Sequence, residues 1–380
     1  MKLLFASDSF KGSLTSEETA VLLEKAAEEV FGKCEVSSAP VADGGEGTVE
    51  AVIAAEKGKK IELTVHGPLM EKADAFYGSF GENKAVIEMA SASGLPMVPQ
   101  ELRNPLNTTT YGTGELILDA LERGYRDISI AIGGSATNDG GMGCARALGV
   151  KFLDENGNEL EGFGRDLIHV KTIDVSGLDS RIKESKITVM CDVTNPLCGK
   201  DGATMTFGKQ KGATPEIQEE LEKGMCNYRD VIKETFGIDC DQVQGAGAAG
   251  GLGAALKVFL GGTMKSGIDT VLDLIHFDER LEGVDLVVTG EGRTDWQSCF
   301  GKVMQGVGMR AKAKGIPVLG LSGSLGKHSL DICDYGVASL MTTVNAPMSL
   351  EEALDNAKEL YYEGAVRMFK FVKTGMDMRK

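Results

Sequence analysis

The chain has 380 residues, more than the ~250–300 that one hydrophobic core usually holds, so two domains are expected. Its 42% hydrophobic and 25% charged residues are typical of a globular protein and exclude broad disorder. Lysine and arginine number 40 against 56 acidic residues, and the net charge of −16 disfavours nucleic acid and anionic membrane surfaces as partners.

Glycine is in clear excess, with 50 residues where the usual ~7% would give about half as many. No Gly-X-Y period is present, so collagen is excluded and the surplus predicts tight turns and close backbone approaches. The 8 cysteines form no Cys-x-x-Cys pair, which disfavours a zinc or disulfide framework and indicates reduced thiols in the cytoplasm. The first apolar run, residues 3–6, is too short for a signal peptide, and no run approaches the ~18 apolar residues of a membrane span.

The first 55 residues alternate between strand and helix patterns. Residues 2–7 form an apolar run, and residues 16–27 show a Ser/Thr cap, early acids and an apolar stripe, which predict a helix. A second strand is expected over 34–41, and a second helix ends near residue 55. This rhythm is typical of a parallel α/β layer.

The middle of the chain follows a different pattern. Three short runs separated by turn sequences, at residues 61–65, 73–80 and 85–89, predict antiparallel strands. Mixed α/β elements follow, with strands expected at 128–132 and 187–191 and helices at 113–123 and 215–236.

The parallel rhythm returns near the end, with strands expected at 286–288, 317–321 and 338–344 and helices at 302–314 and 349–372. Together with the two early strands, these three complete a five-stranded, flavodoxin-like doubly wound parallel sheet of order 2-1-3-4-5. We therefore expect a flavodoxin-like domain made of residues 1–60 plus 265–380, with a second α/β domain, residues 61–264, inserted into it.

Five glycine-rich or polar turns directly follow predicted strands: residues 8–12, 43–47, 133–143, 192–196 and 289–295. Ligands of open parallel sheets bind beyond the carboxyl ends of the strands, where the strand order reverses, here between the Asp8 and Thr289 turns. The convergence predicts a cleft for a small anionic ligand. Taken singly, the turn at 43–47 is equally typical of a capped tight turn, Lys11 of a surface charge and Asp192 of a turn cap.

The turn at 133–143 carries the strongest single signal, because Ser135, Thr137 and Asn138 stand among five glycines before a helix. Exposed N–H groups in such a turn suit phosphate or carboxylate. Residues 245–250 match a dinucleotide fingerprint by letter, but no apolar strand precedes them, so we expect a helix start that packs closely or faces a ligand. Phosphoryl transfer is favoured, although a dehydrogenase or a periplasmic-type binding protein would share much of this pattern.

Seven segments, in order over nearly the whole chain, resemble the type-1 glycerate kinase family: residues 8–13, 40–48, 112–117, 133–141, 191–197, 245–253 and 289–295. The resemblance implies ATP-dependent, Mg²⁺-requiring phosphorylation of (R)-glycerate to 2-phosphoglycerate in a cleft between two α/β domains. It implies small-molecule partners, without nucleic acid or membrane, and leaves a homo-oligomer open. The alternatives are a glycerate 3-kinase, a kinase of a related hydroxy acid, or a non-catalytic binding or sensor protein.

Phosphoryl transfer needs positioning and charge neutralisation rather than a covalent nucleophile, and this chemistry assigns roles to the matched residues. Asp192 would accept the hydroxyl proton, and Lys11 would neutralise the transferring phosphoryl group or the glycerate carboxylate. Oxygen ligands suit Mg²⁺, and the candidates are Asp43, Glu46 and Asp295. The candidates for binding substrate or nucleotide are Asp8, Ser9, Gly134, Ser135, Thr137, Asn138, Asn195, Glu291 and Gln297.

Overall fold

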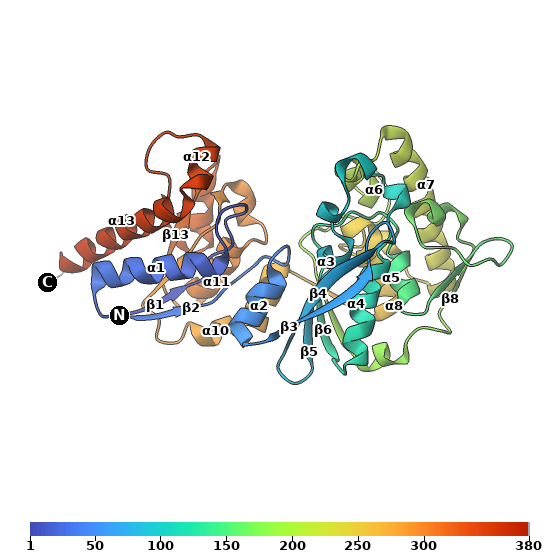
Figure 1. Ribbon diagram of the computed structural model, residues 1–380, viewed down its shortest axis with the longest axis horizontal. Helices are drawn as coiled ribbons and strands as arrows, with labels where there is room; N and C mark the ends of the chain where they lie inside the picture. Colours follow the sequence, from blue (N-terminus) through green and yellow to red (C-terminus); the bar gives the residue numbers. More distant parts are fainter. Residues whose placement is uncertain (379–380) are drawn as a thin grey trace. The chain divides into compact units, whose positions relative to one another are not determined.

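A computed structural model describes residues 1–378, and their contacts divide the chain into two compact units (Figure 1). Unit 1 comprises residues 1–43 and the chain from 268 onward, and unit 2 comprises residues 44–267. From the sequence, these boundaries were expected after residues 60 and 264. The difference lies in α2 (Thr48–Glu56), which packs on β4 (Lys72–Phe80) and β5 (Lys84–Glu88) and therefore lies in unit 2.

The sheet of unit 1 has five strands in the order β15-β13-β11-β1-β2, and every neighbouring pair is parallel. The strands are β1 (Lys2–Phe5), β2 (Glu35–Ser38), β11 (Leu286–Thr289), β13 (Val318–Ser322) and β15 (Val337–Thr342). This is the doubly wound order 2-1-3-4-5 that the sequence predicted. Central strands β1 and β11 are apolar and buried along nearly their whole length, as strands covered on both faces must be.

Three of the predicted helices of this unit are present, one of them interrupted, and two short helices, α9 (Gly267–Leu274) and α10 (Phe277–Arg280), were not predicted. The others are α1 (Ser16–Phe31), α11 (Val303–Ala313), α12 (Leu350–Asp355) and α13 (Ala357–Asp377). Helix α1 begins at a capping box in which Thr15 and Glu18 bond each other's backbone N–H groups. The single helix expected over 349–372 is broken at Asn356, whose side chain donates to the Glu352 carbonyl.

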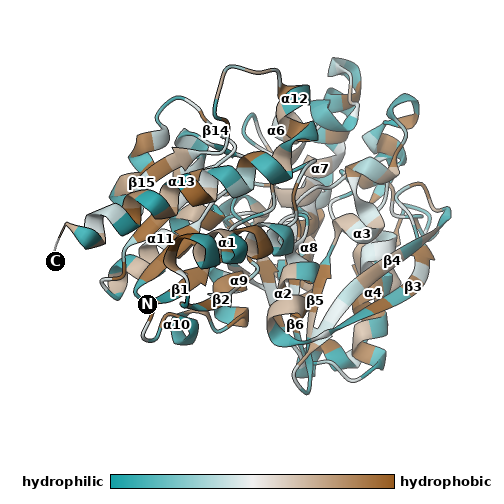
Figure 2. Cartoon of the chain, turned by 60° about the vertical axis from the view of Figure 1, so that its left-hand side comes forward, coloured by the Kyte–Doolittle hydropathy of each residue, from teal (hydrophilic) through white to brown (hydrophobic). Residues whose placement is uncertain are grey.

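Helices α1 and α13 lie side by side, and both alternate between hydrophobic and hydrophilic residues along their length (Figures 1 and 2). The buried residues of α1 include Leu23 and Val30, and those of α13 include Tyr361 and Phe369. The two helices thus share one apolar core with β1, because an amphipathic helix must bury its apolar stripe. No helix within residues 1–378 is long and apolar enough to cross a membrane.

The sheet of unit 2 has six strands in the order β10-β9-β6-β5-β4-β3. Its further strands are β3 (Lys59–His66), β6 (Asp127–Ala131), β9 (Lys186–Met190) and β10 (Thr263–Lys265). Strands β3, β4 and β5 pair antiparallel, as predicted, but β5 pairs parallel with β6 on its other side. The crossover from β5 to β6 contains a helix, and such a connection returns the chain in the same direction.

The helices of unit 2 are α2, α3 (Ala90–Ser93), α4 (Tyr111–Glu122), α5 (Met142–Ala147), α6 (Ala203–Phe207), α7 (Pro215–Phe236) and α8 (Leu252–Leu260). Two small sheets pair β7 (Lys151–Leu153) with β8 (Thr172–Asp174), and β12 (Arg293–Thr294) with β14 (Ser324–Leu325) of unit 1.

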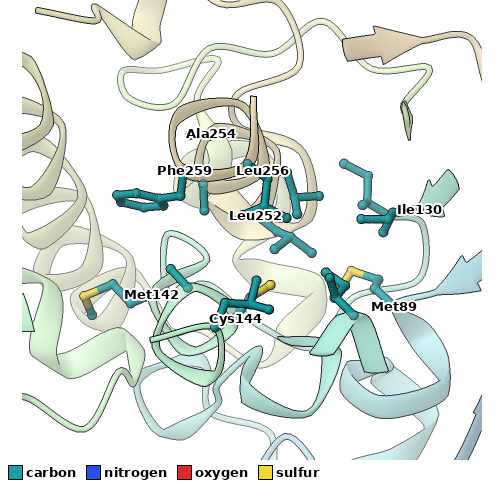
Figure 3. Close-up of a cluster of buried hydrophobic side chains, with 14 of the residues drawn as sticks. Met89, Ile130, Met142, Cys144, Leu252, Ala254, Leu256 and Phe259 are labelled. Atoms are coloured by element: carbon teal, nitrogen blue, oxygen red, sulfur yellow. The ribbon is translucent and has the colours of Figure 1, made fainter. Parts of the chain in front are cut away.

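The core of unit 2 fixes the two helices that follow its glycine-rich loops. Met142 and Cys144 of α5 face Leu252 and Phe259 of α8 across a dry cluster that Ile130 of β6 completes (Figure 3). A fully buried side chain of this size contributes about 1.5–3 kcal/mol relative to exposure. Packing of α5 and α8 therefore determines where the loops before them lie.

Candidate functional site

Three carboxylates follow adjacent strands of unit 1. Asp8 follows β1, Asp43 follows β2 and Glu291 follows β11. Burial, and to a lesser extent the negative charges of Asp43 and Glu291, raise the pKa of Asp8 to about 7, against the opposing effects of the Ser9 N–H and the charge of Lys11. The Ser9 N–H donates to Asp8 Oδ1 at 2.7 Å. The ends of these strands thus gather negative charge at the predicted switch point.

Glu291 is nearly buried and held in one orientation by two hydroxyl groups. Its Oε1 accepts from Ser298 Oγ at 2.5 Å and from Thr294 Oγ1 at 3.1 Å. Burial raises its pKa, which these bonds and the charge of Lys302 oppose. A carboxylate fixed by neighbouring hydroxyls presents its remaining oxygen in a defined direction.

Lys11 occupies a tight turn in which Phe10 and Leu14 exchange backbone hydrogen bonds. Gly12, with φ of +81°, supplies the left-handed conformation that the turn requires. The Lys11 side chain is exposed, and no ion pair within residues 1–378 holds its ammonium group. It is therefore an exposed positive charge near the Asp8 carboxylate.

Asp295 and Gln297, also predicted for the site, lie in a short helical turn over Trp296–Cys299. Asp295 caps this turn by accepting the Gln297 N–H at 2.9 Å, and its other oxygen lies 3.5 Å from Arg293 Nε. Its carboxylate is therefore engaged locally, whereas the Gln297 side chain is exposed. Trp296 packs edge-on against the exposed Phe300.

The loop over 133–143 in unit 2 requires a correction. We expected its N–H groups to be exposed, but those of Gly140, Gly141, Met142 and Gly143 donate to protein acceptors. The exposed part is Gly133 and Gly134, with Ser135 at its edge, whereas Thr137 and Asn138 are fully buried. At the start of the helix after this loop, a side-chain carboxylate already accepts N–H groups, so these are not free to bind a phosphate.

That anion is Asp139, which the sequence analysis did not select. Its Oδ2 accepts from Thr110 N and Oγ1, both at 2.7 Å, and from the Gly143 N–H at 3.2 Å, while Oδ1 accepts from the Gly141 N–H at 3.0 Å. The carboxylate thus bridges the starts of α4 and α5. Burial raises its pKa, and these four bonds oppose that shift. An Asp before Gly-Gly at a helix start was the signal that could have identified it.

Lys211, in the turn before α7, is a second buried charge that contacts the 133–143 loop, and it too was missed. Its side chain is 2% exposed, and Nζ donates to the Thr137 carbonyl at 2.6 Å. Burial lowers the pKa of this lysine to about 7, and the charge of Asp139 opposes the shift. A lysine within Lys-Gln-Lys-Gly is typical of a solvated turn, so the sequence contains no signal of its burial.

Glu88, at the end of β5, is a third buried group outside the prediction. It accepts the Val49 N–H at 2.7 Å and thereby fixes the start of α2. Burial raises its pKa to about 7, and the negative charges of Glu50 and Glu46 contribute. Glu46, predicted as a metal ligand, is exposed beside this helix start.

Asp192 and Asn195 lie on the loop after β9. Asp192 is exposed, and its Oδ1 accepts the Gly267 N–H at 2.9 Å. Asn195 donates from Nδ2 to the Asp201 carbonyl at 2.7 Å, and its own carbonyl accepts the Gly247 N–H at 3.0 Å. Asn195 therefore shapes its loop, and Asp192 is the carboxylate that this loop presents to solvent.

The segment 245–253 packs closely against the loop after β9 and against the 133–143 loop. Close packing was one of the two alternatives expected for it from the sequence. A Cβ on Gly247 would lie 2.2 Å from the Pro196 carbonyl oxygen, and one on Gly250 would lie 2.0 Å from that of Thr137. Gly250 also has φ of +65°. Only glycine permits this approach, so the segment serves to hold the other loops rather than to bind a dinucleotide.

The comparisons with known proteins extend over nearly the whole chain and include all of the loops described above. A protein-family model described as the glycerate kinase family matches residues 3–373. The chain belongs to the glycerate kinase family. The resemblance stated from the loop sequences is confirmed, and with it the expectation of a phosphotransferase enzyme.

Individual relatives match over nearly full length. Glycerate 2-kinase of Escherichia coli strain K12 is 49% identical over 358 residues, covering 94% of each chain. Glycerate kinase of Bacillus subtilis strain 168 is 46% identical over 368 residues, covering 97% of this chain and 96% of its own. A crystal structure of a protein provisionally assigned as glycerate kinase 2, from Salmonella typhimurium LT2, has a TM-score of 0.90 and 44% identity over 99% of each chain. The predicted α/β fold class is confirmed.

Proposed function

We propose that this protein transfers a phosphoryl group from ATP to (R)-glycerate, giving 2-phosphoglycerate, and that it needs Mg²⁺. The observation that carries the proposal is the 49% identity, over 94% of each chain, to the Escherichia coli protein named glycerate 2-kinase. Both substrates are anions and the chain has a net charge of −16, so local cations must bring the substrates to the protein.

The carboxylates of unit 1 fit a divalent cation. Mg²⁺ prefers carboxylate oxygens, and the crowding of Asp8, Asp43 and Glu291 that raises the pKa of Asp8 would be relieved by a bound cation. We propose that Asp43 holds the ion. Asp295, engaged with its own turn and Arg293, and the exposed Glu46 are weaker candidates than the sequence suggested. When bound, Mg²⁺ would neutralise charge on the phosphate oxygens.

Lys11 is proposed to neutralise the transferring phosphoryl group or the glycerate carboxylate, as its exposed position allows. For the anion-binding backbone we retain Gly133, Gly134 and Ser135, the part of the glycine-rich loop near solvent. Thr137 and Asn138, being buried, are proposed to shape that part rather than to touch a ligand.

Two carboxylates are candidates for the group that accepts the hydroxyl proton. Asp192, the choice made from the sequence, is exposed and oriented by the Gly267 N–H. Asp8 has a pKa near 7, the value that suits a general base at neutral pH. Rate–pH profiles distinguish them: the variant that loses the acidic limb of kcat, with KM for glycerate little changed, identifies the base.

The proposal as a whole is tested by coupled detection of ADP release with and without (R)-glycerate, followed by phosphorus NMR of the product. Glycerate-dependent ADP release and a phosphomonoester at C2 are expected. A signal at C3 would make the protein a glycerate 3-kinase. Faster release with another hydroxy acid would reassign the substrate. Glycerate binding without any ADP release would make it a sensor and refute the proposal.

A further inference from the structure

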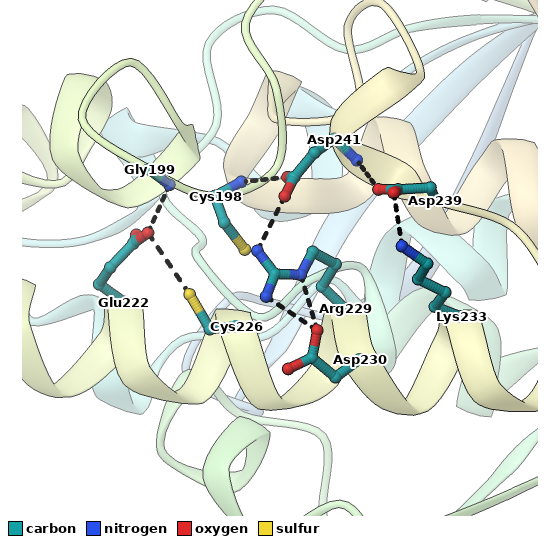
Figure 4. Close-up of polar contacts among 9 residues, drawn as sticks. All are labelled: Cys198, Gly199, Glu222, Cys226, Arg229, Asp230, Lys233, Asp239 and Asp241. Carbon is teal, nitrogen blue, oxygen red and sulfur yellow. Dashed lines mark hydrogen bonds and ion pairs between the residues drawn. The ribbon is translucent and has the colours of Figure 1, made fainter.

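A cluster of two thiols and a carboxylate lies apart from the residues discussed above. Cys198 stands on the loop after Asn195, while Glu222 and Cys226 lie one turn apart on α7 (Figure 4). One donor atom from each of the three side chains lies within 4.8 Å of the others. Soft thiolates together with a carboxylate are a ligand set for zinc rather than for magnesium.

The distances within the cluster match a tetrahedral site. Cys226 Sγ lies 3.7 Å from Glu222 Oε1. With Zn–S of about 2.3 Å and Zn–O of about 2.1 Å, a tetrahedral angle places the two ligand atoms about 3.6 Å apart. Helix α7 therefore already holds its two ligands near the required separation, and the Cys198 sulfur lies within 4.8 Å of donor atoms of both.

Glu222 supplies an independent indication of a missing cation. Its Oε1 accepts the Gly199 N–H at 2.6 Å, but Oε2 is buried and has no hydrogen-bond partner within residues 1–378. A buried carboxylate oxygen without a partner is costly, and native structures rarely contain one. A cation bound by this carboxylate and the two sulfurs would compensate the unpartnered oxygen.

The surroundings support ligation by thiolates. Asp241 accepts the Cys198 N–H at 2.9 Å and the Arg229 guanidinium at 2.8 Å, so the loop that presents Cys198 is fixed from behind (Figure 4). Arg229 also brings positive charge near the cluster, while burial raises the pKa of both thiols, so Zn²⁺ binding would release their protons. The charged groups that face the cluster are thus Glu222, Arg229 and Asp241. Such outer partners usually orient metal ligands and tune them.

We propose that Cys198, Glu222 and Cys226 form a Zn²⁺ site, with a fourth position for water. The ion would tie the 195–202 loop, which Asn195 holds closed through Asp201, to α7. It would therefore rigidify the segment that follows Asp192. The site is independent of the proposed reaction, because none of its ligands is assigned to substrate, nucleotide or Mg²⁺.

The test uses the full chain, reduced and freed of metal with a chelator. Zn²⁺ is titrated against a chromophoric competitor, and Co²⁺ serves as a spectroscopic probe. We expect one Zn²⁺ per chain, thiolate-to-cobalt charge-transfer absorption, and a Zn²⁺-dependent rise in thermal unfolding temperature that Mg²⁺ does not reproduce. Because even outer-shell changes weaken zinc sites by about 10–100-fold, Cys226→Ser and Glu222→Gln should each weaken binding by about 100-fold or more.

The matched control is Cys34→Ser, which removes a partly exposed thiol of unit 1 and should leave Zn²⁺ affinity unchanged. Glu222→Gln retains the acceptor for the Gly199 N–H, so a folded variant is available even if a cysteine variant unfolds. The proposal is overturned if the reduced protein binds no Zn²⁺, if Glu222→Gln and Cys226→Ser bind it as tightly as the wild type, or if Co²⁺ shows no thiolate absorption. Mass spectrometry showing a Cys198–Cys226 disulfide, together with no Zn²⁺ binding after reduction, would replace the metal site by a redox pair.

Discussion

Asp139→Asn is the most informative single change, because one buried carboxylate joins the starts of two helices. The amide can keep one oxygen in place of Oδ2, but its NH₂ group then faces the Gly141 N–H, so a donor meets a donor. The bonds to Thr110 and Gly143 lose their charge assistance. Hydrogen bonds to charged groups contribute about 1.5–3 kcal/mol each against about 0.5–1.5 for neutral ones, and a buried unpaired donor costs about 1–3 kcal/mol.

Removal of the buried charge offsets part of this loss, since burial already raises the pKa of Asp139. We therefore expect Asp139→Asn to lower the free energy of unfolding by about 3–5 kcal/mol, the range for breaking a buried charged network. Urea denaturation followed by far-ultraviolet circular dichroism measures this change. Hydrogen exchange at the Gly141 and Gly143 amides should accelerate selectively.

The matched control is Asp154→Asn, since Asp154 also accepts backbone N–H groups, from Asn156 and Asn158, but in an exposed turn. It should change stability far less than Asp139→Asn. If the two variants have the same unfolding midpoint, or if exchange at Gly141 and Gly143 is unaffected, Asp139 does not organise the loop and the reasoning is refuted.

Four further outcomes are expected. The pKa of Asp8 is raised to about 7, so its stabilising contribution is present below pH 4 and lost as pH rises to 7. The free energy of unfolding of Asp8→Asn should therefore exceed that of the wild type by up to about 4 kcal/mol at pH 8 and equal it at pH 4. A difference that does not depend on pH would contradict this. The pKa of Lys211 is lowered to about 7, so its charge penalises folding below that pH and less above it. The free energy of unfolding of the wild type should therefore gain about 3 kcal/mol over that of Lys211→Met between pH 6 and 9, and parallel stability curves would exclude the lowered pKa. Lys11→Met should lower kcat by roughly 10²–10³-fold if Lys11 stabilises the transition state, or raise only KM for glycerate if Lys11 binds the ground state and the transition state equally. If kcat and KM both keep their wild-type values, Lys11 is only a surface charge. Chelation with EDTA should abolish the activity and Mg²⁺ or Mn²⁺ restore it, whereas full activity after exhaustive chelation would remove the metal from the proposal.

The positions of helices and strands, and much of their pairing, could be predicted from the sequence alone. Short apolar runs ended by polar turns located β1, β11 and β13, and their order is that of the flavodoxin-like doubly wound sheet expected from this alternation. Capping residues located α1, and a proline after Thr214 located the start of α7. The loop sequences were sufficient to identify the family, because each contains residues that a specific backbone conformation or ligand requires.

What the tertiary structure decided is which polar groups are buried and what they bond. Asp139, Lys211 and Glu88 look like ordinary charged residues of turns and strand ends, yet all three are enclosed by elements far away in sequence. The N–H groups of Gly140–Gly143, predicted to be free, are taken by such contacts. Likewise, α2 belongs to unit 2 because it packs on β4 and β5, and no local sequence pattern reveals that contact. Local propensity acts over a few residues, whereas burial, and with it the pKa of a carboxylate or an ammonium group, depends on what the rest of the chain places around it.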